Sequence, residues 1–339
     1  MTDAAPLRVI DFGTAAPLRS QTLWHAVAYG VSGGAAPTLS FVSPSDPYVS
    51  IGYHRRLDEV DLETCAANSW PVYRRMIGGG PVYLDSGQLF FQITVPVKAV
   101  PAARRDALRW LLAPAIEAYH AAGIPAELDE QLEIVVGDRK ICGYGAGQIG
   151  DAAIVAGNLI IDFDHDAAAS ILRAPFLTAR DELAHLIRRY VAATPADPSA
   201  FKSAAIDAYA QAFTLTPREG VLNPIERDRV DELDQRFLAQ TWLEGRTRPD
   251  PIAWQVKIRA GVWMFAAQDP QAELVVCVAN DRVLSAHLQH AGLNGSSSSL
   301  EAELAGLTLA EATSALKRSG EPGRCLANLF THADPGRSL

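Results

Sequence analysis

Two consecutive arginines stand directly before three consecutive glycines in Val-Tyr-Arg-Arg-Met-Ile-Gly-Gly-Gly-Pro-Val-Tyr-Leu-Asp, residues 72–85. Glycine lacks a Cβ atom, so residues 78–80 can adopt positive φ angles and let a ligand approach the main chain closely. Backbone N–H groups presented in this way bind anions, and Arg74 and Arg75 add permanently charged, planar donors. The stretch therefore indicates an anion-binding loop. The same residues would also form an ordinary glycine-rich hairpin turn with solvated arginines.

A lysine lies in a second glycine-bounded stretch, Gly-Asp-Arg-Lys-Ile-Cys-Gly, residues 137–143. Taken alone, Lys140 would be an ordinary solvated lysine at the end of a strand. Its register favours a functional role, because Gly143 follows three residues later and a glycine-rich strand pattern returns after it.

The pattern Arg-Arg-x-x-Gly-Gly-Gly-x-Val-Tyr-x-Asp-x-Gly-x-Leu, residues 74–89, resembles the signature of lipoate–protein ligases. These belong to the wider family of lipoyl, octanoyl and biotinyl transferases. The Lys140 stretch is similar to the family segment Gly-x-Lys-Ile-Ser-Gly, so the resemblance implies that Lys140 is the catalytic residue. A cation between the attacking carboxylate and the α-phosphate of ATP would offset their repulsion as an acyl-adenylate forms. No covalent enzyme intermediate is needed.

The resemblance also implies which neighbouring residues bind ATP and lipoate, with Mg²⁺ expected as part of the ATP complex. The expected nucleotide-binding residues are Arg75, Gly78, Gly79, Gly80, Pro81, Val82, Tyr83 and Asp129. The expected acyl-binding residues are Arg74, Ile77, Leu84, Asp85, Cys142, Gly143, Gly157 and Asn158. The histidines and cysteines show no metal-ligand spacing, so we expect no separate metal site.

Several positions depart from the family pattern. Met76 and Ile77 replace small hydroxyl residues, Leu84 and Ala156 replace histidines, Cys142 replaces a serine, and Asn158 replaces threonine or serine. These changes make the expected pocket more apolar, which suits a long or bulky acyl chain. They leave open whether the acyl group is lipoate, octanoate or another chain.

Three other functions are compatible with the sequence. An octanoyl or lipoyl transferase would work without ATP through a cysteine thioester, but its relatives carry that cysteine before the lysine motif, where residues 123–136 contain none. A biotin ligase would normally have a Gly-Arg-Gly-Arg type of loop. A carrier-binding homologue that has lost catalysis would fit the departures at residues 76, 77, 84 and 156, although Lys140 and Arg75 are retained.

Hydrophobic periodicity predicts the elements that position these residues. The predicted strands are at 7–12, 38–42, 48–53, 89–95, 133–141, 152–163, 254–265, 273–279 and 283–288. The predicted helices are at 20–30 with Ser20 as N-cap, 57–68, 102–122, 181–192, 198–213, 226–239 and 309–316. With the resemblance, this order predicts an α+β catalytic domain at 1–225, with a mixed, largely antiparallel sheet like that of class II synthetases and biotinyl or lipoyl ligases. A connector helix and a small α+β accessory domain are predicted at 226–339.

Composition limits the partners and the compartment. A net charge of −9 argues against a protein that lives on nucleic acid or anionic membrane. The start carries no signal-peptide pattern, and four scattered cysteines are typical of reduced thiols, so we expect a cytoplasmic protein. We also expect a monomer. The resemblance implies a lipoyl-domain or H-protein-like carrier as partner. Such carriers are typically acidic, so steering would need a local basic patch, for which the candidates are Arg55, Arg56, Arg246 and Arg248.

Overall fold

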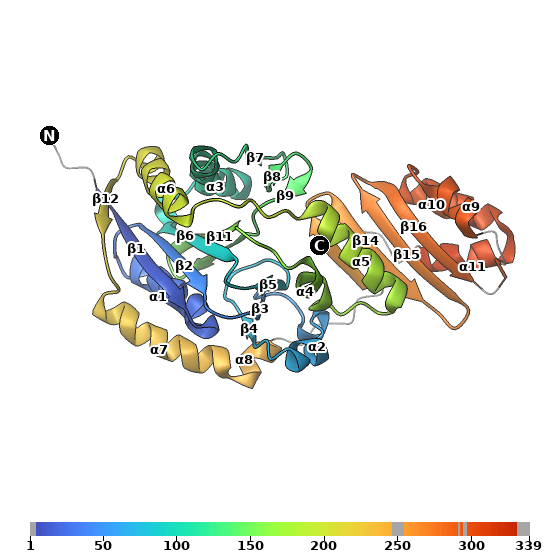
Figure 1. The fold of residues 1–339 in the computed structure, drawn as a ribbon, viewed down its shortest axis with the longest axis horizontal. Helices are drawn as coiled ribbons and strands as arrows, with labels where there is room; N and C mark the ends of the chain where they lie inside the picture. Colours follow the sequence, from blue (N-terminus) through green and yellow to red (C-terminus); the bar gives the residue numbers. More distant parts are fainter. Residues whose placement is uncertain (1–4, 246–253, 291, 294–296, 331–339) are drawn as a thin grey trace. The chain divides into compact units, whose positions relative to one another are not determined.

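The computed structural model describes residues 5–245, 254–290, 292–293 and 297–330 (Figure 1). The chain divides into two compact units, of which the first comprises Met1–Leu172 and Val191–Thr247. The second comprises Arg173–Tyr190 and Arg248–Leu339. Both units combine helices with sheets, which confirms the predicted α+β class.

A six-stranded mixed sheet forms the centre of the first unit, in the order β10-β11-β6-β2-β1-β12. Its strands are β1 (Pro6–Ala15), β2 (Thr38–Pro44), β6 (Gln88–Pro96), β10 (Gly145–Ile149), β11 (Ala152–Ile160) and β12 (Thr216–Glu219). The pairs from β10 to β2 are antiparallel, whereas β2–β1 and β1–β12 are parallel. The largely antiparallel sheet predicted from the sequence is therefore present.

Helices cover both faces of this sheet (Figure 1). Along β6, Leu89, Phe91 and Ile93 join a buried cluster with helices α3 (Arg104–Ala121) and α6 (Pro198–Phe213). Phe90 joins a different cluster with helix α1 (Pro17–Ser32). This alternation follows the two-residue period of a strand and explains why apolar residues of β6 pack on both faces of the sheet. The helices of the first unit are α1 (Pro17–Ser32), α2 (Leu62–Ala67), α3 (Arg104–Ala121), α4 (His165–Ser170), α6 (Pro198–Phe213), α7 (Pro224–Leu238) and α8 (Gln240–Glu244), with short 3₁₀ turns η1 (Leu57–Glu59) and η2 (Val97–Ala99).

Two small sheets carry the two motifs. One has the order β4-β3-β5, with β3 (Tyr48–Ile51), β4 (Val72–Arg74) and β5 (Val82–Leu84) around the glycines. The other is an antiparallel set of β7 (Glu127–Leu128), β8 (Ile134–Val136) and β9 (Arg139–Lys140). The single strand predicted at 133–141 is wrong, because the chain reverses at Gly137, which has a φ of +60°.

Sequence predictions about a helix cap and a domain boundary also differ from the structure of the first unit. The predicted N-cap Ser20 is wrong: α1 begins at Pro17, whose fixed φ suits the first turn, and the Ser20 hydroxyl donates to Pro17 O inside the helix. The boundary predicted between residues 225 and 226 also differs from the observed units. Helix α7 belongs to the first unit because its Val230, Leu233 and Phe237 form a buried cluster with Ala26 of α1.

In the residues that the structure describes, the second unit contains an antiparallel sheet in the order β13-β14-β15-β16 and four helices. Its elements are α5 (Leu177–Tyr190), β13 (Trp254–Arg259), β14 (Val262–Gln268), β15 (Ala272–Ala279), β16 (Arg282–His290), α9 (Ser297–Leu304), α10 (Leu309–Arg318) and α11 (Gly320–Phe330). The single strand predicted at 254–265 is wrong, because Gly261 turns the chain with a φ of +75°. The hairpin turn at Asn280–Asp281 is confirmed, since both residues have positive φ.

Helix α5 is joined to this sheet by a polar cluster around Glu182. The Glu182 carboxylate accepts hydrogen bonds from Cys277 Sγ at 3.2 Å and Ser285 Oγ at 2.9 Å, and it lies 3.2 Å from His287 Nε2. The hydrogen bond from His287 lowers the pKa of Glu182 to about 2. The same bond raises the pKa of His287 above its usual value, and Glu301 adds to that effect.

This pair predicts a pH dependence of stability. A raised His287 pKa contributes stability in full below the unfolded value of about 6.5, and that contribution is lost as pH rises through the folded pKa. The lowered Glu182 pKa contributes above about 4.5 and is lost as pH falls toward 2. We expect the melting temperature to fall modestly above pH 6.5, since His287 is partly exposed, and His287→Gln to flatten this slope. An equal slope in the variant would contradict the assignment.

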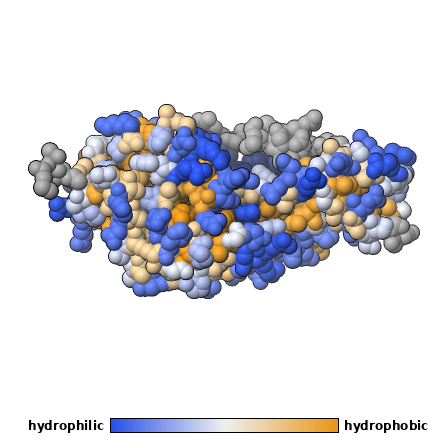
Figure 2. Space-filling model, turned by 90° about the horizontal axis from the view of Figure 1, so that it is seen from above, coloured by the Kyte–Doolittle hydropathy of each residue, from blue (hydrophilic) through white to orange (hydrophobic). Residues whose placement is uncertain are grey.

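No helix among the residues that the structure describes is long and apolar enough to cross a membrane. Hydrophilic residues are interspersed with small hydrophobic areas on the face drawn in Figure 2.

Candidate active site

The glycine loop, residues 75–81 between β4 and β5, packs against the start of β10. The Gly78 N–H donates to Ala146 O at 3.2 Å. A Cβ added to Gly145 or Gly147 would lie only 2.8 Å and 3.0 Å from the Ile77 side chain, so glycines are needed where the loop rests on the strand. Gly145 follows Lys140 by five residues. The structure thus places the glycine loop against the strand that continues from the Lys140 segment.

The buried Arg75 side chain forms hydrogen bonds with the backbone of its own loop. Its guanidinium donates to Gly78 O at 2.9 Å, Gly80 O at 2.9 Å and Ser50 O at 2.8 Å. Burial lowers the pKa of Arg75 to about 10, so the group stays charged at neutral pH. The ATP contact predicted for Arg75 stays a prediction, and the observed role of its guanidinium is to orient the loop carbonyls.

The hydrogen bonds from Arg75 to the loop carbonyls determine which loop N–H group faces outward. In a trans peptide the C=O of one residue and the N–H of the next point in opposite directions. Because the Gly78 carbonyl points at Arg75, the Gly79 N–H points away from it. Within the described part of the chain, the Gly79 and Gly80 N–H groups have no hydrogen-bond partner, and both residues are exposed. The loop therefore offers free amides of the kind that bind anions.

Gly79 cannot readily be another residue. Its φ of +105° is strained for a residue with a side chain, and an added Cβ would lie 2.4 Å from Arg75 Nη2. Gly52 faces the loop from the other side, where an added Cβ would lie 2.0 Å from Gly79 O. These close approaches leave no space for a side chain at residues 52 and 79, so the loop needs glycine at Gly79, as the motif predicted.

Arg74 points to a different part of the first unit. Only 2% of its side chain is exposed, and its guanidinium donates to Arg55 O at 2.6 Å, Gly52 O at 3.0 Å and Leu243 O at 2.7 Å. These acceptors include the carboxyl end of α8, not the surface of the glycine loop. The acyl contact predicted for Arg74 stays a prediction.

A buried histidine that the sequence analysis did not single out also holds the loop. His25 of α1 accepts a hydrogen bond from Met76 N–H through Nε2 at 3.0 Å, and its Nδ1 lies 2.6 Å from Gln21 O. This pattern requires the neutral ring with its proton on Nδ1. Burial lowers the pKa of His25 to about 3, so the ring stays neutral at physiological pH. A lone histidine in a helical pattern gives no sequence signal for this role.

Lys140 lies on β9 with its ammonium 3.3 Å from Glu133 Oε1. The lysine side chain is 22% exposed, whereas that of Glu133 is 6% exposed. Hairpin pairing of Val135 with Lys140 puts Glu133 diagonally across from the lysine on one face. A half-buried ammonium held by one carboxylate can meet a second anion from solvent. Glu133 is a further residue that the sequence analysis missed.

Asn158 connects the Lys140 segment to the strand after the glycine loop. Its Oδ1 accepts from Gly143 N–H at 2.7 Å, and its Nδ2 donates to Gln88 Oε1 at 2.7 Å. Gln88 Nε2 in turn donates to Tyr83 O at 3.3 Å. The predicted residues Tyr83, Gly143 and Asn158 are thus brought together, with Gln88 as an unpredicted link.

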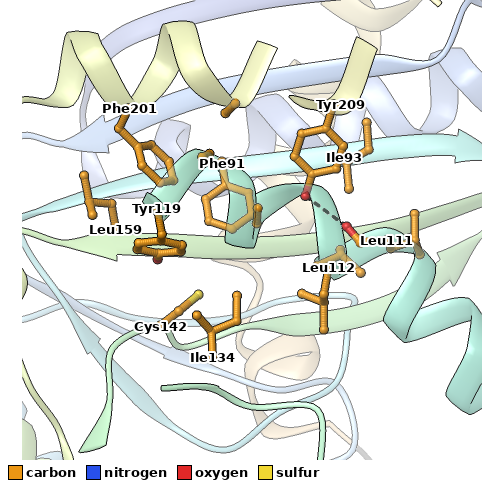
Figure 3. Close-up of a cluster of buried hydrophobic side chains, with 14 of the residues drawn as sticks. Phe91, Ile93, Leu111, Leu112, Tyr119, Ile134, Cys142, Leu159, Phe201 and Tyr209 are labelled. Atoms are coloured by element: carbon orange, nitrogen blue, oxygen red, sulfur yellow. Dashed lines mark hydrogen bonds between the residues drawn. The ribbon is translucent and has the colours of Figure 1, made fainter. Parts of the chain in front are cut away.

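The Cys142 side chain is fully buried in the core of the first unit. Figure 3 shows it close to Tyr119 and Ile134 among buried side chains, where Tyr209 also donates to Leu111 O at 2.9 Å. The Asn158 N–H approaches Cys142 Sγ at 3.4 Å, and burial raises the pKa of the thiol. A neutral, inaccessible thiol is a poor nucleophile.

The remaining predicted residues have local roles. Asp129 Oδ1 accepts from the N–H groups of Gln131 and Glu133 and so closes the turn before β8. Asp85 Oδ1 accepts from Gly87 N–H at 3.0 Å in the turn before β6, and burial raises its pKa. Pro81 and Val82 lead from the loop into β5 and are half-buried. Their predicted ligand contacts stay predictions.

Gly157 is required by packing, which gives a stability prediction. An added Cβ would lie 2.6 Å from Cζ of the fully buried Phe91. We expect Gly157→Ala to lower the free energy of unfolding by about 1–3 kcal/mol, as overpacked cores do. In the control Gly143→Ala, the nearest atom to the new Cβ is Asn158 Oδ1 at 3.7 Å, so denaturant unfolding should change less. Equal losses in both variants would contradict this reason.

Comparison with known proteins decides the family. The family model of the lipoyl protein ligase A/B catalytic domain matches residues 18–193. The chain belongs to this family. It is 23% identical over 241 residues to the octanoyltransferase LipM of Kyrpidia tusciae, covering 62% of this chain and 88% of that protein. It is 26% identical over 234 residues to the lipoate-protein ligase A subunit 1 of Thermoplasma acidophilum, covering 65% and 88%.

A solved structure has the same fold. The bi-partite lipoate protein ligase of Thermoplasma acidophilum matches with a TM-score of 0.65 at 24% identity, covering 73% of this chain and 100% of that chain. This likeness confirms the predicted ligase-like fold. The chain is thus an enzyme of the lipoate ligase and octanoyltransferase family.

Four of the six positions that depart from the expected family pattern lie in one cluster of buried side chains. Ile77 and Leu84 are buried in the cluster beneath α1, and Met76 and Ala156 pack against the same cluster. These four side chains therefore belong to one apolar cluster.

The basic patch predicted for the carrier is partly neutralised. Arg55 pairs with Glu59 at 2.6 Å, and Arg56 donates to Asp58 at 2.8 Å. Arg246 and Arg248 lie outside the described residues. The arginines at 55 and 56 therefore supply less net positive charge than their sequence suggests.

Proposed function

We propose that the chain is an ATP-dependent lipoate–protein ligase, which joins lipoate or a similar acyl acid to a lysine of a carrier protein. The observation that supports this most is the state of its thiols. The first unit contains two cysteines, Cys65 and Cys142, and both are buried. Burial raises the pKa of both thiols, that of Cys65 to about 11. A thioester route needs an accessible thiolate, whereas activation by ATP does not.

The proposed chemistry has two steps. A carboxylate oxygen of the acyl acid attacks the α-phosphorus of ATP, and pyrophosphate leaves. The amine of the carrier lysine then attacks the acyl carbon, AMP leaves and the amine loses a proton. Lys140 would offset the negative charge that gathers on the phosphate and carboxylate in both steps. The outward Gly79 amide is a suitable donor to a phosphate oxygen.

We propose that Mg²⁺ takes part as a complex with ATP. The residues that the structure describes contain no group of three or more His, Cys, Asp or Glu side chains that could hold an ion. Mg²⁺ commonly binds through substrate phosphates with one or two carboxylates, so it would arrive with the nucleotide. We propose a lipoyl-domain or H-protein-like acceptor and a cytoplasmic location; the solved bi-partite ligase was studied with its E2 lipoyl domain.

The octanoyltransferase relative favours a second function, transfer of an octanoyl or lipoyl group between carriers without ATP. Mass spectrometry of lipoyl-domain and H-protein carriers separates the two. The proposal expects a mass increase of one lipoyl group with lipoate, ATP and Mg²⁺, and none when ATP is omitted. Transfer from an octanoyl carrier in the absence of ATP would establish the second function instead. No modification in either arm would overturn both.

Replacement of Cys142 by alanine sharpens this distinction. Because the sulfur is buried in the core and its thiol has a raised pKa, we expect Cys142→Ala to change kcat/KM by less than about twofold. Cys65→Ala is the matched control, since it removes the other buried thiol of the first unit. Loss of activity in Cys142→Ala alone, with an unchanged melting temperature, would support the thioester mechanism.

A further inference from the structure

Residues 224–244, which form α7 and α8, lie beyond the part of the chain that the family model matches. They nevertheless make a reciprocal contact with the strand that enters the glycine loop. Trp242 Nε1 donates to Arg74 O at 2.8 Å. In return, the Arg74 guanidinium donates to Leu243 O at 2.9 and 2.7 Å and to Glu244 O at 3.2 Å.

This contact joins three separate segments. The acceptors of Arg74 include the last carbonyls of α8, which have no partner inside the helix and carry the negative end of its dipole. Arg74 also donates to carbonyls of residues 52–55, the turn that packs under Gly79. One buried guanidinium therefore fixes α8, this turn and β4 together.

A second line of contacts reaches the loop from the same segment. Phe237 of α7 packs edge-on against His25, with ring centroids 5.0 Å apart. The ring of Trp242 is roughly parallel to that of Phe237 at 6.0 Å. His25 accepts the Met76 N–H, so α7 and α8 support the loop at Met76 as well as at Arg74.

We propose that residues 224–244 are a positioning element of the active site, and that Arg74 and Trp242 are positioning residues that hold the glycine loop in its anion-binding conformation. Their effect is to reduce the freedom of the loop before a ligand binds, which is how supporting contacts improve a site.

The first test does not depend on the reaction. In the wild type, the N–H groups of Arg75, Met76 and Gly78 are protected by hydrogen bonds. Trp242→Phe keeps the aromatic ring and removes its donor. We expect hydrogen–deuterium exchange of the peptide 72–84 to become several-fold to tenfold faster, while the peptide 89–95 of β6 is unchanged.

Trp110→Phe is the matched control. Trp110 is also half-buried and stacks on a phenylalanine, Phe213, at 4.0 Å, but it lies on α3. Its variant should leave exchange of peptide 72–84 unchanged. Unaltered exchange in Trp242→Phe, or equal acceleration in both variants, would overturn the proposal.

The second test rests on the proposed function. A looser loop should raise KM for ATP by about threefold to tenfold and change kcat by less than twofold in Trp242→Phe. Arg74→Lys keeps the charge but cannot reach several carbonyls at once, so it should show the same pattern more strongly. If the wild type modifies no carrier, the proposed function fails and the exchange result still decides the positioning role. A fall in kcat with unchanged KM and unchanged exchange would contradict it.

Discussion

Replacement of Lys140 by alanine is expected to slow carrier modification by about a hundredfold to a thousandfold, the range seen when one charge-stabilising donor is removed. The ammonium is the cation on β9 that is half-buried and held by a single carboxylate contact at 3.3 Å. In the proposed reaction, its loss leaves the charge on the phosphate and carboxylate without an offset. Stability should change little, because the lysine side chain remains partly exposed.

Lys202→Ala is the matched control for this variant. The Lys202 side chain is 23% exposed and pairs with Asp11 at 2.7 Å, so both lysines have similar exposure and a carboxylate partner. The rates of carrier modification should therefore separate the two variants, and circular dichroism with thermal melting should show both folded. An inactive Lys140→Ala that is also unfolded would mean that the lysine is structural. Equal activity losses in both variants would remove the catalytic assignment.

Replacement of Glu226 by alanine is expected to have the largest effect on stability, about 3–5 kcal/mol, as when one partner of a buried ion pair is removed. The Glu226 side chain is fully buried and pairs with Arg8 of β1, whose side chain is 14% exposed. Glu226 also accepts the Asn223 N–H in the capping box that starts α7. The variant leaves a mostly buried arginine uncompensated and also removes the capping-box hydrogen bond from Asn223 N–H to the Glu226 carboxylate.

Glu232→Ala on the same helix is the control. Glu232 is 59% exposed and pairs with Arg229 one turn away, so its loss should cost less than about 0.5 kcal/mol. Guanidinium unfolding curves would give both values, with the change read from the midpoint at constant slope. A midpoint for Glu226→Ala close to that of Glu232→Ala would show that the buried pair contributes little.

The elements around the motifs could be predicted because their signals are local. Runs rich in β-branched, aromatic and other apolar residues located β6 and β11, and the glycine triplet located the loop. The hairpin at Gly137 could also have been found, since Gly-Asp is a two-residue turn signal between apolar runs. That turn would have placed Glu133 beside Lys140 on one face. The error at 133–141 therefore concealed the acid that holds the proposed catalytic lysine.

The roles of the two arginines could not be predicted, because their partners are defined by the fold. Arg74 meets carbonyls near residue 243, far away in sequence, and Arg75 turns inward to its own loop. A guanidinium next to glycines suggests an anion ligand from its chemistry alone, and sequence gives no sign that backbone carbonyls already occupy it. The same holds for His25, whose partner Met76 lies on another element.

The division of the chain into two units limits how the C-terminal unit could be exchanged by recombination within the gene. The backbone passes between the units three times, after Leu172, after Tyr190 and after Thr247, because α5 belongs to the second unit. A single break after Thr247 would leave α5 on the first fragment, with Glu182 separated covalently from Cys277 and Ser285. Because the second unit consists of two separate chain segments, a single recombination event cannot exchange it as a whole. Two polypeptides divided at that point would have to associate through α5 to restore the second unit.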